Sequence, residues 1–160
     1  MEPGNGQMRR RESLAFLCAM LLGNPTAMHA NADDTDMIEF KTTLPFDRAV
    51  ARVVDAIQAA GMQLFATIDH AAAAASVDLS MPPTTVLVYG NPKGGTPLML
   101  ASPAAALDLP LRVLVRADAD GRTFVAFHPI GKTLSRAGVP EALAKRLAPA
   151  QDMLVDALRN

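Results

Sequence analysis

The stretch from Tyr89 to Met99 decides the fold of this chain and reads Tyr-Gly-Asn-Pro-Lys-Gly-Gly-Thr-Pro-Leu-Met. It follows an apolar run that begins at Val86, and such a run without polar alternation is typical of a strand buried on both faces. Thr96 followed by Pro97 is typical of an N-cap and a first helical residue. The stretch therefore predicts a buried strand over residues 84–89, a Gly-rich turn, and a helix that begins at Pro97.

The turn Lys93-Gly94-Gly95 has two interpretations. Successive backbone N–H groups at a helix N-terminus, with a cation beside them, are the parts of an anion-binding loop. The order differs from a nucleotide-binding P-loop, in which the lysine follows the glycines. The alternative is a rigid turn in which Lys93 meets only solvent or Asp108. Helix capping leaves Asn91 and Lys93 unexplained, so these two residues are candidates for ligand contact.

Residues 1–32 have the layout of a secretory signal peptide. A charged patch that begins at Arg9 precedes an apolar run at residues 14–22, and an A-x-A cleavage motif ends at Ala32. The apolar run is about half of the ~20 residues that a membrane-spanning helix needs. We therefore expect a periplasmic or secreted protein without a permanent membrane anchor, exported by the general or the twin-arginine route.

The remaining part, residues 33–160, is expected to form one domain with one core. The chain has 15 Lys or Arg and 16 Asp or Glu. Three of the former and two of the latter lie in the signal peptide, which leaves twelve against fourteen and a net charge of about −2. Without a basic cluster, nucleic acid is not an expected partner. The single cysteine, Cys18, lies in the signal peptide, so the domain has neither a disulfide nor thiol chemistry.

Hydrophobic periodicity predicts the other elements. Alternation indicates strands at residues 38–44 and 62–68, and spacings of three and four indicate an amphipathic helix between them, at 46–60. Asp69 is placed to cap a short helix that runs to about Ser76. The further elements are strands at 111–117 and 122–128 around an Asp-Gly turn, a short helical turn at 132–137, and a final helix from Val139 that Pro149 should break near Leu147.

This order, β-α-β-(α)-β-α-β-β-α, predicts an α+β fold: a mainly antiparallel sheet with helices packed on one face. Phe65, Leu114, Val125 and Phe127 fall out of phase with the expected core positions. They would make the open face of the sheet apolar, and a homodimer is the simplest way to cover it. The alternative is that these residues pack beneath loops.

Several blocks of the sequence resemble the domain-of-unknown-function 302 family. They are Asp69-His70 with the alanine run after it, Pro83-Thr84-Thr85, the segment Gly90–Met99, and Leu107–Arg112. The likeness covers residues 36–158. It implies a TATA-binding-protein-like α+β fold that is often dimeric and has no established activity.

Four polar side chains are the candidate ligand-binding residues: Asn91, Lys93, Asp108 and His70. Each lies at or just beyond the end of a predicted element, where ligand sites tend to collect, so we expect them to converge. His70 is also a weak candidate for a catalytic residue. No metal site and no cofactor are expected, because no H-x-x-x-H motif is present and the domain lacks cysteine.

The sequence supports three hypotheses of function. The first is an exported, non-catalytic domain that binds a small polar or anionic ligand, or a protein partner, near the turn at residues 90–96. The second is a hydrolase-like enzyme with His70 as general base and the Gly94 and Gly95 amides as an oxyanion site. The third is a purely structural homodimeric module.

Overall fold

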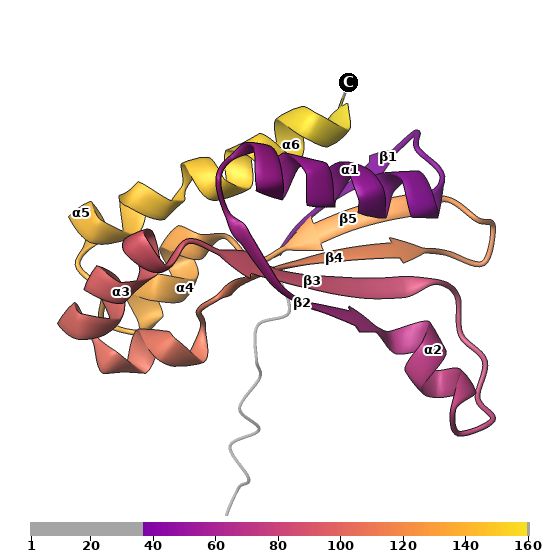
Figure 1. The fold of residues 1–160 in the computed structure, drawn as a ribbon, viewed down its shortest axis with the longest axis horizontal. Helices are drawn as coiled ribbons and strands as arrows, with labels where there is room; N and C mark the ends of the chain where they lie inside the picture. Colours follow the sequence, from indigo (N-terminus) through magenta and orange to yellow (C-terminus); the bar gives the residue numbers. More distant parts are fainter. Residues whose placement is uncertain (1–36, 160) are drawn as a thin grey trace, which may run out of the picture. The chain divides into compact units, whose positions relative to one another are not determined.

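The computed structural model of the chain describes residues 37–159, and the predicted signal peptide lies outside them. The described part is an α+β domain, which confirms the predicted class (Figure 1). Its elements are β1 (Ile38–Thr42), α1 (Phe46–Ala59), β2 (Gln63–Asp69), α2 (His70–Ala75), β3 (Thr84–Gly90), α3 (Pro92–Ala101), η1 (Pro103–Leu107), β4 (Leu111–Ala117), β5 (Thr123–Phe127), α4 (Ile130–Arg136), α5 (Glu141–Ala144), η2 (Lys145–Leu147) and α6 (Pro149–Arg159). No helix in residues 37–159 is long and apolar enough to cross a membrane.

The five strands form one antiparallel sheet in the order β1-β5-β4-β3-β2. Alternate residues of the three inner strands point to the core: Leu87 and Tyr89 of β3, Val113 and Val115 of β4, and Val125 of β5 are fully buried. Because β3 and β5 run in the same direction, both end at one end of the sheet. The loops that leave them therefore start at the same end of the sheet, on either side of β4.

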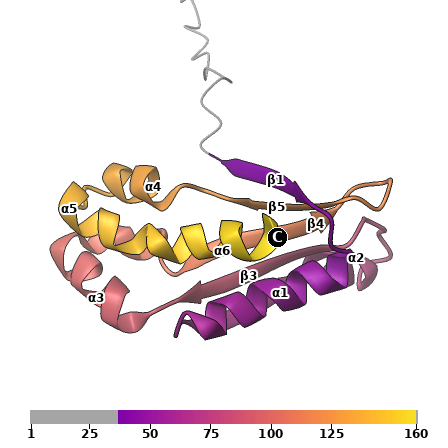
Figure 2. The same ribbon diagram turned by 90° about the horizontal axis from the view of Figure 1, so that it is seen from above.

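One face of the sheet is covered by α1 and α6, which contact each other (Figure 2). The stripe Ala49, Val53 and Ile57 on α1 is fully buried, as its spacing predicts. Leu154 and Leu158 face the core from α6. Helices α3, α4 and α5 gather at the end of the sheet where β3 and β5 stop (Figures 1 and 2). That end is where polar and apolar side chains from many elements meet.

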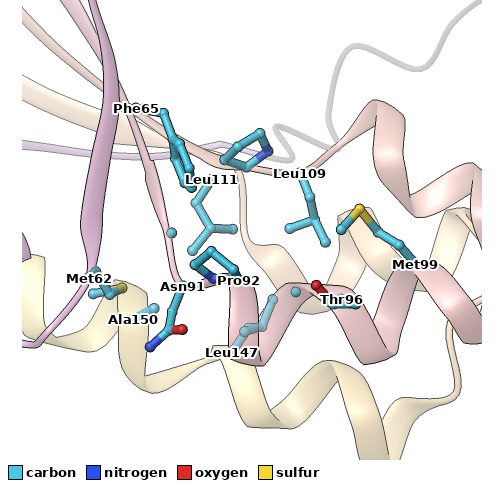
Figure 3. A pocket seen from close by; sticks show the side chains of 13 residues that line it. Met62, Phe65, Asn91, Pro92, Thr96, Met99, Leu109, Leu111, Leu147 and Ala150 are labelled. Carbon is cyan, nitrogen blue, oxygen red and sulfur yellow. The ribbon is translucent and has the colours of Figure 1, made fainter.

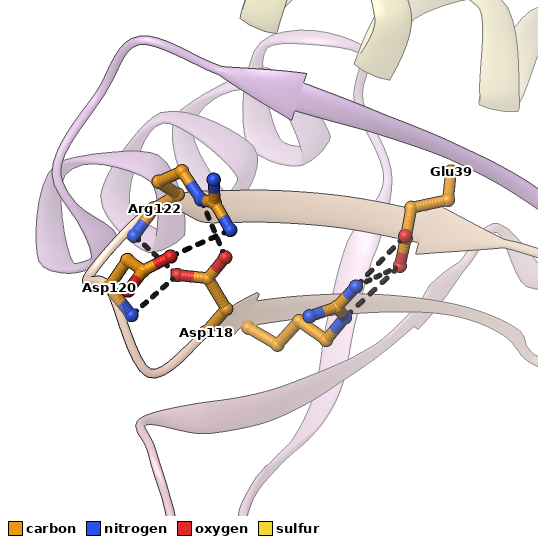
Figure 4. Close-up of polar contacts among 5 residues, drawn as sticks. Glu39, Asp118, Asp120 and Arg122 are labelled. Atoms are coloured by element: carbon orange, nitrogen blue, oxygen red, sulfur yellow. Dashed lines mark hydrogen bonds and ion pairs between the residues drawn. The ribbon is translucent and has the colours of Figure 1, made fainter.

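The predicted Asp-Gly hairpin joins β4 to β5. Gly121 has a φ of +76°, which glycine adopts at no steric cost. The Asp118 carboxylate accepts the backbone N–H groups of Asp120 and Arg122 and pairs with the Arg122 guanidinium at 2.7 Å (Figure 4). Desolvation alone would raise the pKa of Asp118, but the hydrogen bonds and charge of Arg122 outweigh it and hold that pKa below its usual value.

The face of the sheet opposite α1 and α6 carries Val86, Val88 and Leu114, all partly exposed. The prediction that Val125 and Phe127 also point to this face is wrong. Cα pairing of Val125 with the buried Val115 puts them on the core side, with 0% and 4% exposure. Periodicity alone does not say which of the two alternating sets faces the core, and here the pairing of β5 with β4 decides it.

An ion pair ties β4 to β1 across β5. The Arg116 guanidinium contacts both carboxylate oxygens of Glu39 at 2.9–3.0 Å (Figure 4). It also lies 4.5 Å from the centroid of the Phe124 ring, which is on the strand between them. The bidentate geometry and the cation–π contact fix the position of the edge strand β1. They also occupy Arg116, so this arginine is not available to a ligand.

Two expectations about helix ends have different outcomes. The chain breaks near Leu147, as the position of Pro149 predicts: η2 ends there and α6 starts at Pro149. The prediction that the central helix begins at Pro97 is wrong, because α3 begins at Pro92 and Pro97 lies inside it. The Gly-rich segment was predicted to be a turn that precedes the helix. In the structure it forms the first turn of α3 itself.

Candidate functional site

An apolar pocket lies at the junction of β3 and α3. Its volume is about 180 Å³. Figure 3 shows side chains that converge on it from β2, β4, α3 and the segment between α5 and α6. Its lining consists of Met62, Phe65, Gly90, Asn91, Pro92, Gly95, Thr96, Met99, Leu109, Pro110, Leu111, Leu147 and Ala150. None of these residues has a titratable side chain.

Asn91 organises the junction. Its side-chain oxygen accepts the Lys93 N–H at 2.9 Å, and its carbonyl accepts the N–H groups of Gly94 and Gly95 at 2.9 Å each. Pro92, as the first helical residue, has no N–H to satisfy. The backbone donors that an anion-binding loop would present are therefore already bonded within the chain.

The glycines of this turn are explained by packing. A Cβ at Gly94 would lie 3.3 Å from Leu147, and one at Gly95 would lie 3.8 Å from Leu109. The contact at Gly94 is closer than side chains normally allow, so glycine lets α3 approach η2. Neither glycine has a positive φ. Gly94 therefore serves the close approach of α3 and η2, whereas the distance at Gly95 is an ordinary van der Waals contact.

Tyr89, the last large residue of β3, is a core residue that is linked by one hydrogen bond to the pocket residue Ala150. Its side chain is fully buried, and its hydroxyl donates to the carbonyl oxygen of Ala150, a pocket residue, at 3.3 Å. Burial raises the pKa of Tyr89 well above its ordinary value. The phenol is therefore neutral at physiological pH and acts as a hydrogen-bond donor between β3 and α6.

The four predicted site residues do not converge. Asn91 is exposed and lines the pocket, whereas Lys93 is exposed on α3 and is not among the lining residues. Asp108 follows η1 and lines a separate, polar cleft. No hydrogen bond or ion pair within residues 37–159 joins the side chains of Lys93 and Asp108. Asn91 and Asp108 therefore line two different sites, and Lys93 lines neither of them.

His70 lies at the other end of the sheet. Gln63 pairs with Gly90 and Asp69 pairs with Thr85, so β2 carries the chain away from the turn before His70 is reached. The seven residues of β3 span roughly 20 Å at about 3.3 Å per residue. Asp69 caps α2 as predicted, by accepting the Ala72 N–H at 2.9 Å. The hypothesis that joins His70 to the Gly94 and Gly95 amides is thus ruled out by the register.

The sequence did not predict the apolar residues that line the pocket. Met62, Phe65, Met99, Leu109 and Leu147 come from segments far apart in the chain, and no short motif connects them. One signal was present: Phe65 is out of phase, and the pairing of β2 with β3 shifts between Leu64 and Ala66. Within residues 37–159, no group of three or more His, Cys, Asp or Glu side chains could hold a metal ion.

The chain is similar to proteins of one family over nearly all of the described residues. A family model with the description "Domain of unknown function DUF302" matches residues 38–160. The crystal structure of uncharacterized conserved protein DUF302 from Bacillus stearothermophilus has the same fold, with a TM-score of 0.67 at 14% sequence identity. That match covers 78% of this chain and 96% of that chain. At this identity the likeness shows the fold alone.

Curated proteins of Brucella are similar in sequence. Fluoride-specific ion channel FluC 1 of Brucella suis is 30% identical over 122 residues, a match that covers 72% of this chain and 48% of that protein. Fluoride-specific ion channel FluC 1 of Brucella abortus and FluC 2 of Brucella melitensis are also 30% identical over 122 residues, with 45% of each protein covered. The chain spans about half the length of the curated relatives that it matches.

The capping of α3 by Asn91 predicts that two substitutions change the free energy of unfolding by different amounts. Asn91→Ala should lower the free energy of unfolding by about 1 kcal/mol, because the Lys93 N–H loses its acceptor. Thr96→Ala should change it by less than about 0.5 kcal/mol, because Thr96 caps nothing. Urea unfolding with an unchanged m-value measures both. A larger loss for Thr96→Ala than for Asn91→Ala would mean that the helix begins at Pro97 after all.

Proposed function

We propose that this chain, which belongs to the DUF302 family, is a non-catalytic binding domain whose ligand occupies the apolar pocket beside Asn91. The observation that carries the proposal is the composition of the pocket. Apolar side chains from several elements enclose it, and the polar side chains of Asn91 and Thr96 are exposed at its edge. Ligand sites typically combine an apolar lining with a few polar groups that fix orientation.

The pocket favours a small ligand with an apolar body and one polar group. Its volume of about 180 Å³ is close to the ~150 Å³ of an apolar cavity that accepts benzene. A single ring or a short branched chain therefore fits. The pocket offers fewer hydrogen-bond donors to an anionic ligand than the sequence suggested, because the backbone N–H groups at the start of α3 are bonded to Asn91.

The same composition argues for binding without catalysis. General acid–base chemistry needs a titratable group within hydrogen-bond reach of the reacting atoms. The thirteen lining residues include no Asp, Glu, His, Lys, Arg, Cys or Tyr. His70, the general base of the enzyme hypothesis, lies at the far end of β2.

The Brucella relatives do not change this proposal. Their name states fluoride-specific channel activity, but this chain covers less than half of each of them. This chain and the Brucella proteins share only the 122 matched residues. The name of those proteins therefore suggests, at most, that this domain acts beside a channel. Binding in the apolar pocket is compatible with such a role.

Phenol, a single ring with one hydroxyl group, is the probe for the pocket. Titrated into the full chain at millimolar concentration, it should move the methyl NMR signals of Met62 and Met99, which line the pocket. Those of Met37 and Met81, which are 41% and 40% exposed and lie elsewhere, should stay in place. Gly95→Leu should abolish the response, because the new side chain fills the pocket.

Gly131→Leu is the matched control, because a side chain at position 131 meets nothing within 4 Å and lies on α4. It should leave the phenol response intact. Equal responses from all four methionines, or an undiminished response in Gly95→Leu, would contradict the proposal.

We also propose that the chain forms a homodimer through the face of the sheet opposite α1 and α6. Val86, Val88 and Leu114 are partly exposed there, and Ile68 at the edge is 44% exposed. Helix α2 has no buried residue, although a helix this short is marginal without packing. A second copy that covers this surface would remove the exposed apolar side chains from water, and a stable dimer typically buries about 800 Å² from each partner.

Light scattering should give the full chain a mass of twice 16.9 kDa. Leu114→Glu should give a folded monomer, because a charge at the centre of the interface cannot be buried unpaired. Ala51→Glu, on the exposed side of α1, should remain dimeric. A monomeric wild-type protein, or a dimeric Leu114→Glu variant, would rule out this interface.

Export is a further part of the proposed function and rests on the signal-like residues 1–32. Expressed with its full N-terminus in a Gram-negative host, the chain should be recovered from the periplasmic fraction without these residues. Intact mass spectrometry reads the cleavage site directly. Recovery of the uncleaved chain from the cytoplasm would contradict export.

A further inference from the structure

One wall of the apolar pocket belongs to the open face of the sheet, the face opposite α1 and α6. Gly90 follows Val86 and Val88 in the alternation of β3, so it points to this face. A Cβ at Gly90 would lie 3.6 Å from the Phe65 ring and 3.7 Å from Pro110. All three residues line the pocket, and Phe65 is 45% exposed. The pocket is therefore continuous with the surface that we propose as the dimer interface.

At the other end of the sheet, residues 70–81 form an apolar arm that consists of α2 and the segment after it. Helix α2 is His70 followed by alanines, and it has no buried residue. Beyond it, Val77, Leu79 and Met81 are 63%, 65% and 40% exposed. Figure 1 shows α2 on the open side of the sheet, away from α1 and α6. The arm is thus an apolar projection that the rest of residues 37–159 leaves largely uncovered.

Two-fold symmetry can bring this arm and the pocket together. In a two-fold dimer every contact occurs twice with the roles exchanged, so two complementary surfaces on one face are both used. The seven residues of β3 separate the pocket from the arm by roughly 20 Å at about 3.3 Å per residue. A two-fold axis across the strands reverses the strand direction between copies and places each arm over the pocket of the other copy. An axis along the strands would instead join the same ends of the two copies.

The distribution of charge favours the axis across the strands. Residues 61–92, which include the arm, contain Asp69 and Asp78 and no lysine or arginine. The pocket end, residues 93–112 and 130–147, is basic, with Lys93, Arg112, Lys132, Arg136, Lys145 and Arg146 against Asp108 and Glu141. Joining the same ends would set like charges against each other, which protein interfaces avoid, whereas joining opposite ends sets the acidic arm against the basic end.

We propose that the arm of a second copy covers the apolar pocket of the first, and the reverse, so that each ligand site is completed by the partner. Leu79, the most exposed apolar side chain of the arm, is then removed from water at the mouth of the pocket. The pocket interior stays available to a small ligand. This inference rests on the ligand site and the dimer proposed above.

Cysteine cross-linking tests which ends of the two copies meet. The single cysteine of the chain is Cys18, so Cys18→Ser gives a full chain without a thiol. In this background, Leu79→Cys in the arm together with Thr96→Cys at the pocket should give a covalent dimer with a short bismaleimide. Within one copy these positions lie at opposite ends of β3, beyond the reach of the reagent. Each single variant should remain uncross-linked, because the two arms of the dimer lie far apart.

Ala51→Cys with Thr96→Cys is the matched control and should give no covalent dimer, because Ala51 lies on the exposed side of α1. A wild-type chain that is monomeric in light scattering would overturn this inference together with the proposed dimer. A dimeric chain in which Leu79→Cys alone is cross-linked, or in which Leu79→Cys with Thr96→Cys is not, would overturn this inference and leave the proposed dimer intact.

Phenol binding tests whether the arm completes the pocket. Leu79→Ser should leave the dimer mass unchanged and weaken the phenol response of Met62 and Met99 about fivefold, because less apolar surface is buried over the ligand. Ile38→Ser is the matched control and should bind phenol as the wild type does, since Ile38 is 41% exposed on β1, the opposite edge strand from β2. Unchanged phenol affinity in Leu79→Ser would overturn the closure by the partner. A wild-type chain without any phenol response would contradict the proposed ligand site itself.

Discussion

The hydrogen bond from the Lys93 N–H to the side-chain oxygen of Asn91 is the interaction on which this end of the molecule depends. It ends β3 and starts α3 within one residue, so the helix leaves the sheet at once. Gly94 then permits the close approach to Leu147. The same bond engages a backbone donor that would otherwise face solvent at the helix start. The segment therefore has the residue types of an anion-binding loop, but in the fold it lines an apolar pocket.

The apolar pocket and the polar cleft are close in the chain and opposite in character. Leu109 and Pro110 line the apolar pocket, Asp108 and Arg112 line the polar cleft, and Leu111 contributes to both. The segment between η1 and β4 therefore separates an apolar environment from an ionic one. The opposite end of the sheet carries the tight β4–β5 hairpin and α2, where His70 is exposed. The apolar pocket and His70 thus lie at opposite ends of the sheet.

The sequence predicted those features that are decided by local chemistry. The amphipathic stripe of α1, the Asp69 cap, the Asp-Gly hairpin and the break at Pro149 all depend on residues within a turn or two of one another. The start of α3 was mispredicted because Asn91-Pro92 and Thr96-Pro97 are equally good helix starts in isolation. In the structure the Asn91 side chain accepts the Lys93 N–H, so the helix begins at the first of these two positions.

The site depended on long-range geometry and was predicted only in part. Asn91, which the sequence singled out, lines the pocket. The sequence contains no measure of the β2–β3 register that carries His70 away from it. The apolar wall of the pocket was also beyond local reasoning. Met62, Leu109 and Leu147 look like ordinary core residues until the fold brings them together.

The backbone amide signals of Lys93, Gly94 and Gly95 test the central claim most directly. In a nitrogen-15 NMR titration of the full chain with millimolar inorganic phosphate, these three amides should shift no more than other amides of α3, because Asn91 already accepts their hydrogen bonds. Large, saturable shifts confined to these three amides would show that the junction is an anion-binding loop and would contradict the account.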